Sequence, residues 1–401
     1  MRDTVVIHSS EICLKGGNRG YFEKRLVANI ADRLAPIGAF RILRRQGSFL
    51  AQHDGPLSNS QITAVRTALG SVFGIGTFAI AARCKKTRED ISHACAELLA
   101  EEGPTTFKVF ARRGDKTFPM NSEELAREVG GDLLEVVPHV TVDVHAPKTR
   151  IDVEIPMGDE ALVAVGRESG PGGLPSGTSG RVVSLLSGGI DSPVASWKLM
   201  RRGCEAVFVH FHSYPYTGRE SIEKVQRLAQ TLAEYQGGAS LWLVPLADVQ
   251  QEIVAKADPA MRVILYRRAM LRIAAQIAHR VNAKALVTGD SVGQVASQTL
   301  ENIETVSAAT TLPIFRPLVG ENKNDIVAAA RAINTFTISI EPHEDCCSIF
   351  MPPRAATRST IALALAEEAK CDIAPRMAAA LAAAEQKELR PTFALAATAH
   401  A

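Results

Sequence analysis

The stretch LLSGGIDSPVASW, residues 185–197, decides the fold class of this chain. The apolar run RVVSLL that leads into it predicts a buried strand, and VASWKLMRRG, which follows the loop, predicts a helix. Gly188 and Gly189 let the backbone of the loop approach an anion closely. The hydroxyls of Ser187 and Ser192 and the first amides of the helix can donate hydrogen bonds to phosphate oxygens. Because the GK[ST] of a Walker loop is missing, the motif predicts a phosphate site of another kind.

Strands and helices continue to alternate after this loop. EAVFVHFHS, SLWLVPLA and ALVTGDS predict further strands separated by helices, which indicates an α/β domain with a doubly wound parallel sheet. Ligands of such sheets bind beyond the carboxyl ends of the strands. We therefore expect His210, Phe211 and Gly289 beside the loop. Asp191 is the carboxylate placed to face magnesium or pyrophosphate.

Two α+β modules are predicted ahead of this domain. The order of strands and helices at the N-terminus is typical of a ferredoxin-like domain, which we place at residues 1–60, and a second module follows at 61–168. GPGGLPSGTSG predicts a Gly/Pro linker at 169–180, followed by the parallel-sheet domain at 181–365. The remaining residues, 366–401, form an Ala-rich tail in which RMAAALAAAEQKEL predicts a helical or frayed segment.

The composition narrows the class of protein. Of the 401 residues, 46% are hydrophobic and 22% are charged, which is ordinary for a globular protein and excludes a collagen-like or disordered chain. No apolar run reaches the ~18 residues of a membrane span, and the N-terminus is too polar for a signal peptide, so we expect a cytoplasmic protein. Seven scattered cysteines without a CxxC motif argue against a disulfide scaffold or a zinc ribbon. The adjacent pair Cys346–Cys347 stands out.

The distribution of charge is more informative than its sum. The net charge of +2 neither requires nor excludes a nucleic-acid partner. Residues 1–50, however, hold nine Lys or Arg against four Asp or Glu, and Lys15 and Arg19 belong to this excess. Such a local field favours phosphate binding, and a solvated basic face is the alternative.

The loop also resembles the PP-loop of the N-type ATP pyrophosphatases, which adenylate a carbonyl or carboxyl oxygen and release pyrophosphate. Nearly the whole chain is similar to the tRNA uridine 4-sulfurtransferases, or 4-thiouridine synthases, in the short form that lacks a rhodanese domain. Besides the PP-loop and its linker, the stretches that carry this resemblance are SEICLKGGNRGYFEKRL, FKVFARRGDKTFPMNSEELAREVG, YRRAMLRIAAQIA with LVTGDSVGQVASQTLENI, and FRPLVGENKNDIVAAAR with EPHEDCCSIFMP. The second of them resembles a THUMP domain, an RNA-binding module.

The resemblance implies a reaction and a set of site residues. ATP adenylates O4 of a tRNA uridine, at position 8 in the family, and persulfide sulfur replaces the oxygen to give 4-thiouridine. Lys323 is implied to stabilise the adenylation transition state. The implied ATP contacts are Leu185, Leu186, Ser187, Gly188, Gly189, Asp191, Ser192, His210, Phe211, Arg267, Gly289 and Gln298. The implied tRNA contacts are Lys15, Arg19, Lys108, Arg112, Arg113 and Lys116.

The same resemblance implies how sulfur reaches the tRNA. Only residues 348–401 follow Cys347, too few for the rhodanese domain whose cysteine carries the persulfide in some members. We therefore expect the persulfide on Cys346 or Cys347, loaded by a separate cysteine desulfurase. Adjacent cysteines can release the sulfur only through a strained ring, so a more distant disulfide partner stays open. Sulfur supply to thiamine thiazole synthesis and a homodimer are further expectations that the sequence leaves open.

Two alternative functions are weighed against this interpretation. One is another PP-loop tRNA-modifying or adenylating enzyme, which a glutaminase-like domain or CxxC pairs would favour. The other is a non-catalytic RNA-binding or sulfur-relay protein, which loss of the SGGxDS residues would favour. The chain has neither of the first two features and keeps all of the SGGxDS residues, so the thiouridine interpretation is favoured.

Overall fold

The computed structural model describes residues 1–45, 47–342, 350 and 354–392 of the chain. It divides into two compact units, Met1–Pro175 and a second unit that begins at Ser176. Among the residues described, no helix is long and apolar enough to cross a membrane.

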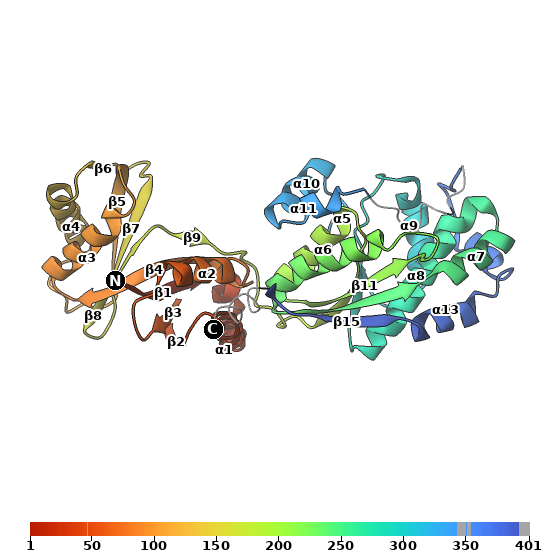
Figure 1. The fold of residues 1–401 in the computed structure, drawn as a ribbon, viewed down its shortest axis with the longest axis horizontal. Coiled ribbons are helices and arrows are strands. Elements are labelled where there is room, and N and C mark those ends of the chain that lie inside the picture. The colour runs from red at the N-terminus through yellow and green to blue at the C-terminus, as the bar shows by residue number, and fades with distance from the viewer. Residues whose placement is uncertain (46, 343–349, 351–353, 393–401) are drawn as a thin grey trace. The chain divides into compact units, whose positions relative to one another are not determined.

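One continuous sheet of nine strands organises the first unit (Figure 1). The strand order is β2-β3-β1-β4-β8-β7-β5-β6, and β9 pairs with β4. In chain order the elements are β1 Arg2–Ser9, η1 Glu11–Asn18, α1 Arg19–Leu34, β2 Phe40–Arg45, β3 Ser48–His53, α2 Asn59–Leu69, β4 Ile75–Lys85, α3 Arg88–Ala100, β5 Thr105–Arg113, α4 Ser122–Val136, β6 Val140–Val142, β7 Thr149–Ile155, β8 Glu160–Val165 and β9 Glu168–Ser169. The two predicted α+β modules thus share a sheet.

Two apolar cores lie against this sheet. One joins α1 and α2 to β1, β3 and β4, with Leu26, Ile30 and Val65 fully buried. The other joins α3 and α4 to β5, β7 and β8. Side chains alternate along a strand, so Val5 and Ile7 of β1 enter the first core while Val6 belongs to a smaller apolar cluster with Leu50 and Ala79.

The second unit confirms the predicted doubly wound sheet. Its strand order is β14-β13-β10-β11-β12-β15, and the first five strands run parallel. The elements are β10 Arg181–Leu185, α5 Asp191–Arg201, β11 Glu205–His212, α6 Glu220–Gln236, β12 Ala239–Pro245, α7 Ala247–Lys256, η2 Pro259–Met261, α8 Arg262–Arg280, β13 Ala285–Val287, η3 Ala296–Gln298, α9 Leu300–Ser307, β14 Ile314–Phe315, α10 Lys323–Ala332, α11 Phe336–Ser339, α12 Ile361–Glu368, α13 Ile373–Ala382 and β15 Glu385–Leu389.

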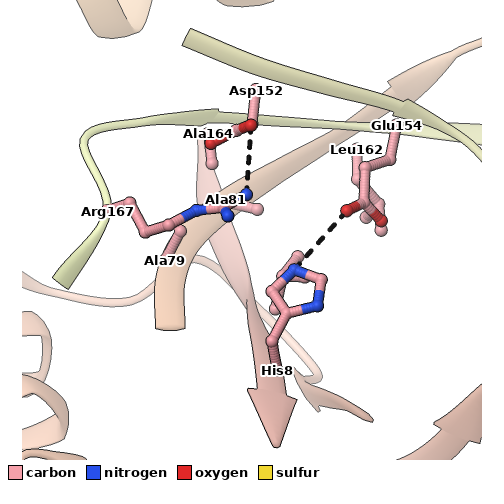
Figure 2. Close-up of a pocket in the computed structure, with 9 residues that line it drawn as sticks. His8, Ala79, Ala81, Asp152, Glu154, Leu162, Ala164 and Arg167 are labelled. Carbon is pink, nitrogen blue, oxygen red and sulfur yellow. Dashed lines mark ion pairs between the residues drawn. The ribbon is translucent and has the colours of Figure 1, made fainter. Parts of the chain in front are cut away.

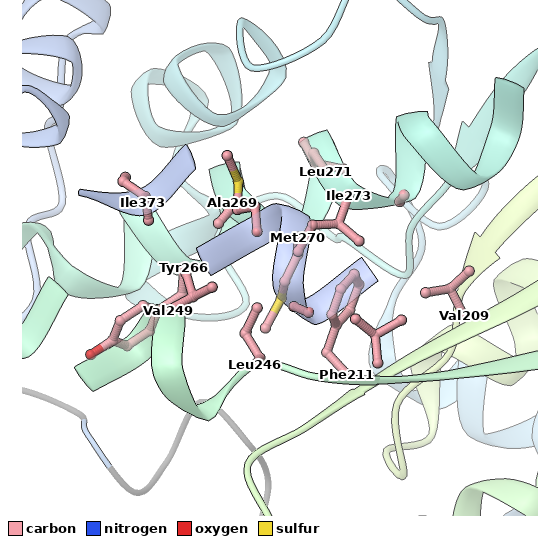
Figure 3. Close-up of a cluster of buried hydrophobic side chains, with 14 of the residues drawn as sticks. Val209, Phe211, Leu246, Val249, Tyr266, Ala269, Met270, Leu271, Ile273 and Ile373 are labelled. Atoms are coloured by element: carbon pink, nitrogen blue, oxygen red, sulfur yellow. The ribbon is translucent and has the colours of Figure 1, made fainter. Parts of the chain in front are cut away.

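Helix α8 supplies much of the core of this unit. Figure 3 shows its Tyr266, Ala269 and Ile273 among Val209 of β11 and Leu246, which precedes α7. All five side chains are fully buried, so α8 packs the sheet from the face that α7 and α13 also cover. The mainly apolar strands β10 and β11 are buried on both faces, as parallel strands usually are.

The Ala-rich tail differs from its prediction. Helix α13 ends at Ala382, and Glu385–Leu389 forms strand β15, antiparallel to β12, where we expected the helix to continue. The free edge of β12 offers backbone hydrogen bonds to this segment, and tertiary pairing overrides the helix propensity of its residues.

Candidate active site at the carboxyl ends of the parallel strands

The predicted phosphate loop lies at the switch point of the second sheet. Strand β10 leads to β11 on one side and pairs with β13 on the other, so the direction of winding reverses beside the loop. The Ser192 hydroxyl closes the loop: it accepts from the Ser187 amide at 2.9 Å and lies 3.0 Å from the Ser187 hydroxyl. The amides in the first turn of α5 therefore point toward the loop 187–192, whose shape is already fixed by these hydrogen bonds. Free amides at the start of a helix are suited to binding an anion.

Gly289 brings β13 against this loop. A Cβ at position 289 would lie 2.8 Å from the Ser192 amide nitrogen and 3.0 Å from the Asp191 carbonyl carbon, closer than side chains tolerate. Only glycine allows the strand end to approach the start of α5 in this way. The structure thus brings the predicted Gly289 and the loop residues together.

Asp191 and Lys323, two predicted catalytic residues, form an ion pair with Nζ–Oδ1 at 2.5 Å. The second Asp191 oxygen accepts from the Gln294 side chain at 2.8 Å. No group of three His, Cys, Asp or Glu side chains suited to a metal occurs in the described parts of the chain. Both Asp191 oxygens are engaged, so a magnesium ion at this loop would have to be held mainly by phosphate oxygens of the nucleotide.

A buried carboxylate, Asp290, organises the next part of the site. It forms ion pairs with Arg267 and with Arg316, the latter at 3.2 Å, and it accepts from the Thr288 hydroxyl at 2.8 Å. Gln298 donates to the same carboxylate at 3.3 Å. Burial opposes ionisation of Asp290, but the two arginines and Thr288 together hold its pKa below the usual range.

Asp290, its two arginines and Thr288 line a small cavity of about 30 Å³ with Leu185, Met270 and Val306. Arg267, predicted from the resemblance, therefore converges with Leu185 at this cavity, and the predicted Gln298 reaches the Asp290 carboxylate. Arg316, Thr288 and Gln294 were missed. The signal for Arg316 is its position directly after β14, because polar residues at the carboxyl ends of parallel strands face the ligand site. Gln294 lies in an irregular loop and has no comparable signal.

The second strand contributes one polar and one apolar residue. His210 is buried, and its Nδ1 lies 2.9 Å from the Leu186 carbonyl oxygen, which ties β11 to the loop. Phe211 points the other way, into the core with Val209 and Leu246 (Figure 3). Leu186 is buried as well. The structure thus places His210 beside the loop and Phe211 in the packing beneath it.

The cysteine pair, Cys346 and Cys347, lies outside the described residues. The segment that leads to it is fixed: the buried Lys224 of α6 donates to the Ser339 and Glu341 carbonyls at 2.8 and 2.6 Å. The Ser339 hydroxyl donates to the Gly189 carbonyl of the loop at 3.3 Å. The phosphate loop and the start of the cysteine-bearing segment are therefore joined by hydrogen bonds.

Four of the described cysteines are poorly suited to thiolate chemistry. Burial raises the pKa of Cys84 to about 11, and it also raises the pKa of Cys95, Cys204 and Cys371. A thiol with a raised pKa is rarely ionised at neutral pH. Cys13 is exposed.

The predicted tRNA contacts all belong to the first unit and fall into two groups. Arg113 donates to the Phe118 and Met120 carbonyls, and Arg19 pairs with Glu23 at 2.7 Å, so both have structural partners. Lys108 donates to the Val144 carbonyl. The remaining predicted contacts are Lys15, half-buried on η1, and the exposed Arg112 and Lys116.

Arg112 borders two open grooves. One, of about 430 Å³, also has Arg150 and Arg167, and the other, of about 610 Å³, has Arg45 and Arg113. A smaller pocket next to them is shown in Figure 2, where His8 faces Glu154 at 3.8 Å and Arg167 faces Asp152 at 3.1 Å. Arginines along open grooves are typical of surfaces that bind phosphates.

Comparisons with known proteins cover nearly the whole chain. The family described as "Thiamine biosynthesis protein (ThiI)" matches residues 177–373, the ThiI ferredoxin-like domain matches 4–79 and the THUMP domain matches 85–165. A relative from Alkaliphilus oremlandii, named "Probable tRNA sulfurtransferase", is 39% identical over 97% of this chain and 99% of its own. A relative of the same name from Thermus thermophilus is 42% identical over 92% of this chain and 90% of its own length.

Solved structures give a matching result. A 4-thiouridine synthetase in complex with RNA and ATP superposes with a TM-score of 0.87 at 34% identity, over 97% of this chain and 100% of that one. PH1313 from Pyrococcus horikoshii has a TM-score of 0.62 at 23% identity over 83% of this chain, a likeness of fold alone.

Proposed function

The chain belongs to the ThiI family of tRNA sulfurtransferases, and from this premise we propose how its own residues carry out the reaction. It is an ATP-dependent enzyme that converts a tRNA uridine to 4-thiouridine. The observation that carries the proposal is the loop 187–192 at the switch point, closed by Ser192 and hydrogen-bonded to the segment that leads to the cysteine pair. This arrangement supports a proposal in which ATP and the sulfur carrier act in one domain.

In the proposed complex, ATP phosphates accept hydrogen bonds from the amides of the loop and of the first turn of α5. Beside the phosphates, the ATP site is lined at the ends of β10 and β11 by Leu185, Leu186 and His210. Gly289 allows the end of β13 to lie close to the loop. Arg267 and Gln298 are held by Asp290, so they present fixed donors toward the nucleotide. Because these donors are already held in place, little free energy is lost in reorienting their side chains when ATP binds.

Lys323 is proposed to act in the adenylation step. When the uridine O4 attacks the α-phosphate and pyrophosphate leaves, negative charge builds up on the phosphate oxygens. Lys323 is paired with Asp191 of the phosphate loop. Its Nζ can turn from that carboxylate toward the negative charge that develops on the phosphate oxygens. Asp191 and the phosphate oxygens would hold the magnesium of Mg-ATP, whose positive charge would lessen the repulsion between the phosphates and this carboxylate.

The sulfur step is assigned to Cys346 or Cys347. A persulfide on one cysteine, supplied by a cysteine desulfurase, attacks C4 of the adenylated uridine, and AMP leaves with the former O4. A second thiolate then attacks the cysteine sulfur of the resulting disulfide link, so that a protein disulfide forms and the new C4 sulfur remains on the tRNA. The raised pKa values of the Cys84, Cys95, Cys204 and Cys371 thiols support the cysteine pair as the carrier.

The test is a reconstituted thiolation with purified protein, unmodified tRNA, Mg-ATP, cysteine and a cysteine desulfurase. Digested tRNA is searched by mass for 4-thiouridine, with Cys346→Ala and Cys347→Ala beside Cys13→Ala, an exposed cysteine of the first unit, as the matched control. We expect ATP-dependent 4-thiouridine that is lost in at least one of the first two variants and kept in the control. Full activity of both single variants and of the double variant would refute the assignment of the sulfur carrier.

A further inference from the structure

The loop between β11 and α6, residues 213–219 with the sequence SYPYTGR, has no role in the function described so far. It begins at the carboxyl end of β11, which runs parallel to β10 with Leu185 opposite Val209. Since β10 runs directly into the phosphate loop, the two loops start side by side on the same edge of the sheet.

The base of this loop is buried and hydrogen-bonded. Ser213 is inaccessible to solvent, and its hydroxyl donates to the Gln250 side chain at 2.5 Å. The amides of Tyr216 and Thr217 donate to the Ser213 carbonyl at 2.7 and 3.2 Å. Thr217 is only 1% exposed. The backbone of the loop is therefore held in one conformation.

Two aromatic rings project from this fixed base. Tyr214 is 43% exposed and Tyr216 is 48% exposed. The Arg219 guanidinium lies 5.2 Å from the centre of the Tyr214 ring. We call Tyr214, Tyr216 and Arg219 the aromatic platform.

A described residue beyond the cysteine pair contacts the platform, and one ahead of the pair is held by the helix that follows the loop. Phe350 packs edge-on against Tyr216, with ring centres 5.6 Å apart, and Glu341 is held by Lys224 and Arg227 of α6. Phe350 is the third residue after Cys347 along the chain. The platform therefore starts on the same sheet edge as the phosphate loop and contacts a described residue close in sequence to the cysteine pair.

We propose that the aromatic platform binds the target uridine after that base has left the tRNA stack. The inference rests on the proposed function, because adenylation at O4 and attack at C4 both require a base that is out of the helix. Exposed aromatic rings with an adjacent arginine are how proteins receive unstacked bases of RNA. Tyr214 and Tyr216 offer the base a π-face, and Arg219 meets the negative charge of the adjoining phosphate.

The first experiment compares Tyr214→Ala and Tyr216→Ala with Tyr214→Phe and Tyr216→Phe, which keep the rings. The exposed Tyr21 of α1 gives a matched control, Tyr21→Ala. Loss of a stacked base lowers the single-turnover thiolation rate about 5- to 150-fold in the alanine variants. We expect the phenylalanine variants and the control to retain the wild-type rate. The affinity for tRNA should stay within about twofold in every variant, because phosphate contacts dominate it.

The second experiment locates the base directly. 4-Thiouridine cross-links to neighbouring side chains under near-ultraviolet light, so product tRNA is bound to the full-length protein, irradiated and mapped by mass spectrometry. The proposal requires cross-links in the peptide that contains residues 213–219. Cross-links elsewhere only, or alanine variants with the wild-type rate, would overturn the platform and leave the thiolation itself standing. A wild-type protein that forms no 4-thiouridine would instead overturn the proposed function.

Discussion

Gly289→Ala tests the close approach that shapes the ATP site. The added Cβ would lie 2.8 Å from the amide nitrogen and 2.9 Å from the Cα of Ser192, and 3.0 Å from the carbonyl carbon of Asp191. All three atoms belong to the backbone, so no side chain can rotate away. The start of α5 must retreat by about 0.5 Å to restore ordinary contact, and overpacking of this kind costs about 1–3 kcal/mol of folding free energy.

The same displacement acts on the reaction. It moves the amides that face the phosphates, and a misplacement approaching 1 Å in an enzyme site can cost about 100-fold in rate. For half of that shift we expect a loss of about 10-fold or more in single-turnover thiolation, together with weaker ATP binding.

The measurement combines urea unfolding, the rise in melting temperature produced by ATP, and the thiolation rate. Gly320→Ala is the matched control, because a Cβ at position 320 meets no atom within 4 Å. We expect Gly320→Ala to match the wild type in all three. An unchanged ATP response and thiolation rate in Gly289→Ala would refute the argument that this contact positions the loop.

Three further predictions concern lysines and a buried carboxylate. Lys323→Met should lower single-turnover thiolation about 100-fold or more and leave the ATP-induced rise in melting temperature nearly intact, because its charge is needed mainly in the transition state; an equal loss of ATP binding would contradict this. Lys224→Met removes two buried charge-assisted hydrogen bonds and should cost about 2–4 kcal/mol in urea unfolding and slow the thiolation step. Arg227→Met, its control, removes an exposed ion pair and should cost less than about 1 kcal/mol; equal losses would contradict the burial argument. Glu252 accepts from Lys256 and from the Asp372 amide, which lower its pKa from 4.5 to about 2, so its stabilisation is full above pH 4.5 and is lost as the pH falls toward 2. The gap in melting temperature between wild type and Glu252→Gln should therefore close over that range, and a gap independent of pH would refute the assignment.

Local sequence patterns were sufficient for four of the five parallel strands and for the phosphate loop. Each of these four strands is a short apolar run, and the loop carries its glycines and serines within six residues, so neighbours along the chain specify them. The fifth parallel strand, β14 at Ile314–Phe315, was not predicted, because a two-residue strand leaves no periodic pattern. The same holds for His210 and Gly289, because position at a strand end is itself a local property. Strand β15 shows the opposite case, since its partner β12 is distant in sequence and decides its conformation.

The ion-pair network around Asp290 could not be predicted in this way. Arg267 comes from α8 and Arg316 from the end of β14, and only the folded sheet brings them to one carboxylate. The hydrogen bond from Ser339 to Gly189 joins residues 150 positions apart. Such contacts depend on tertiary packing, and no periodicity or motif encodes them.

Strand β4 has a consequence for how the first unit can be divided. It pairs with β1 on one side and with β8 on the other. The backbone hydrogen bonds of β4 are therefore made with strands of both α+β modules. A cut between the modules would expose a row of unpaired backbone groups along 75–85, a template for aggregation. The two modules should therefore unfold together in a single cooperative transition. Fusions or truncations that keep Met1–Pro175 intact should stay folded, whereas a fragment that contains only one of the two modules should not.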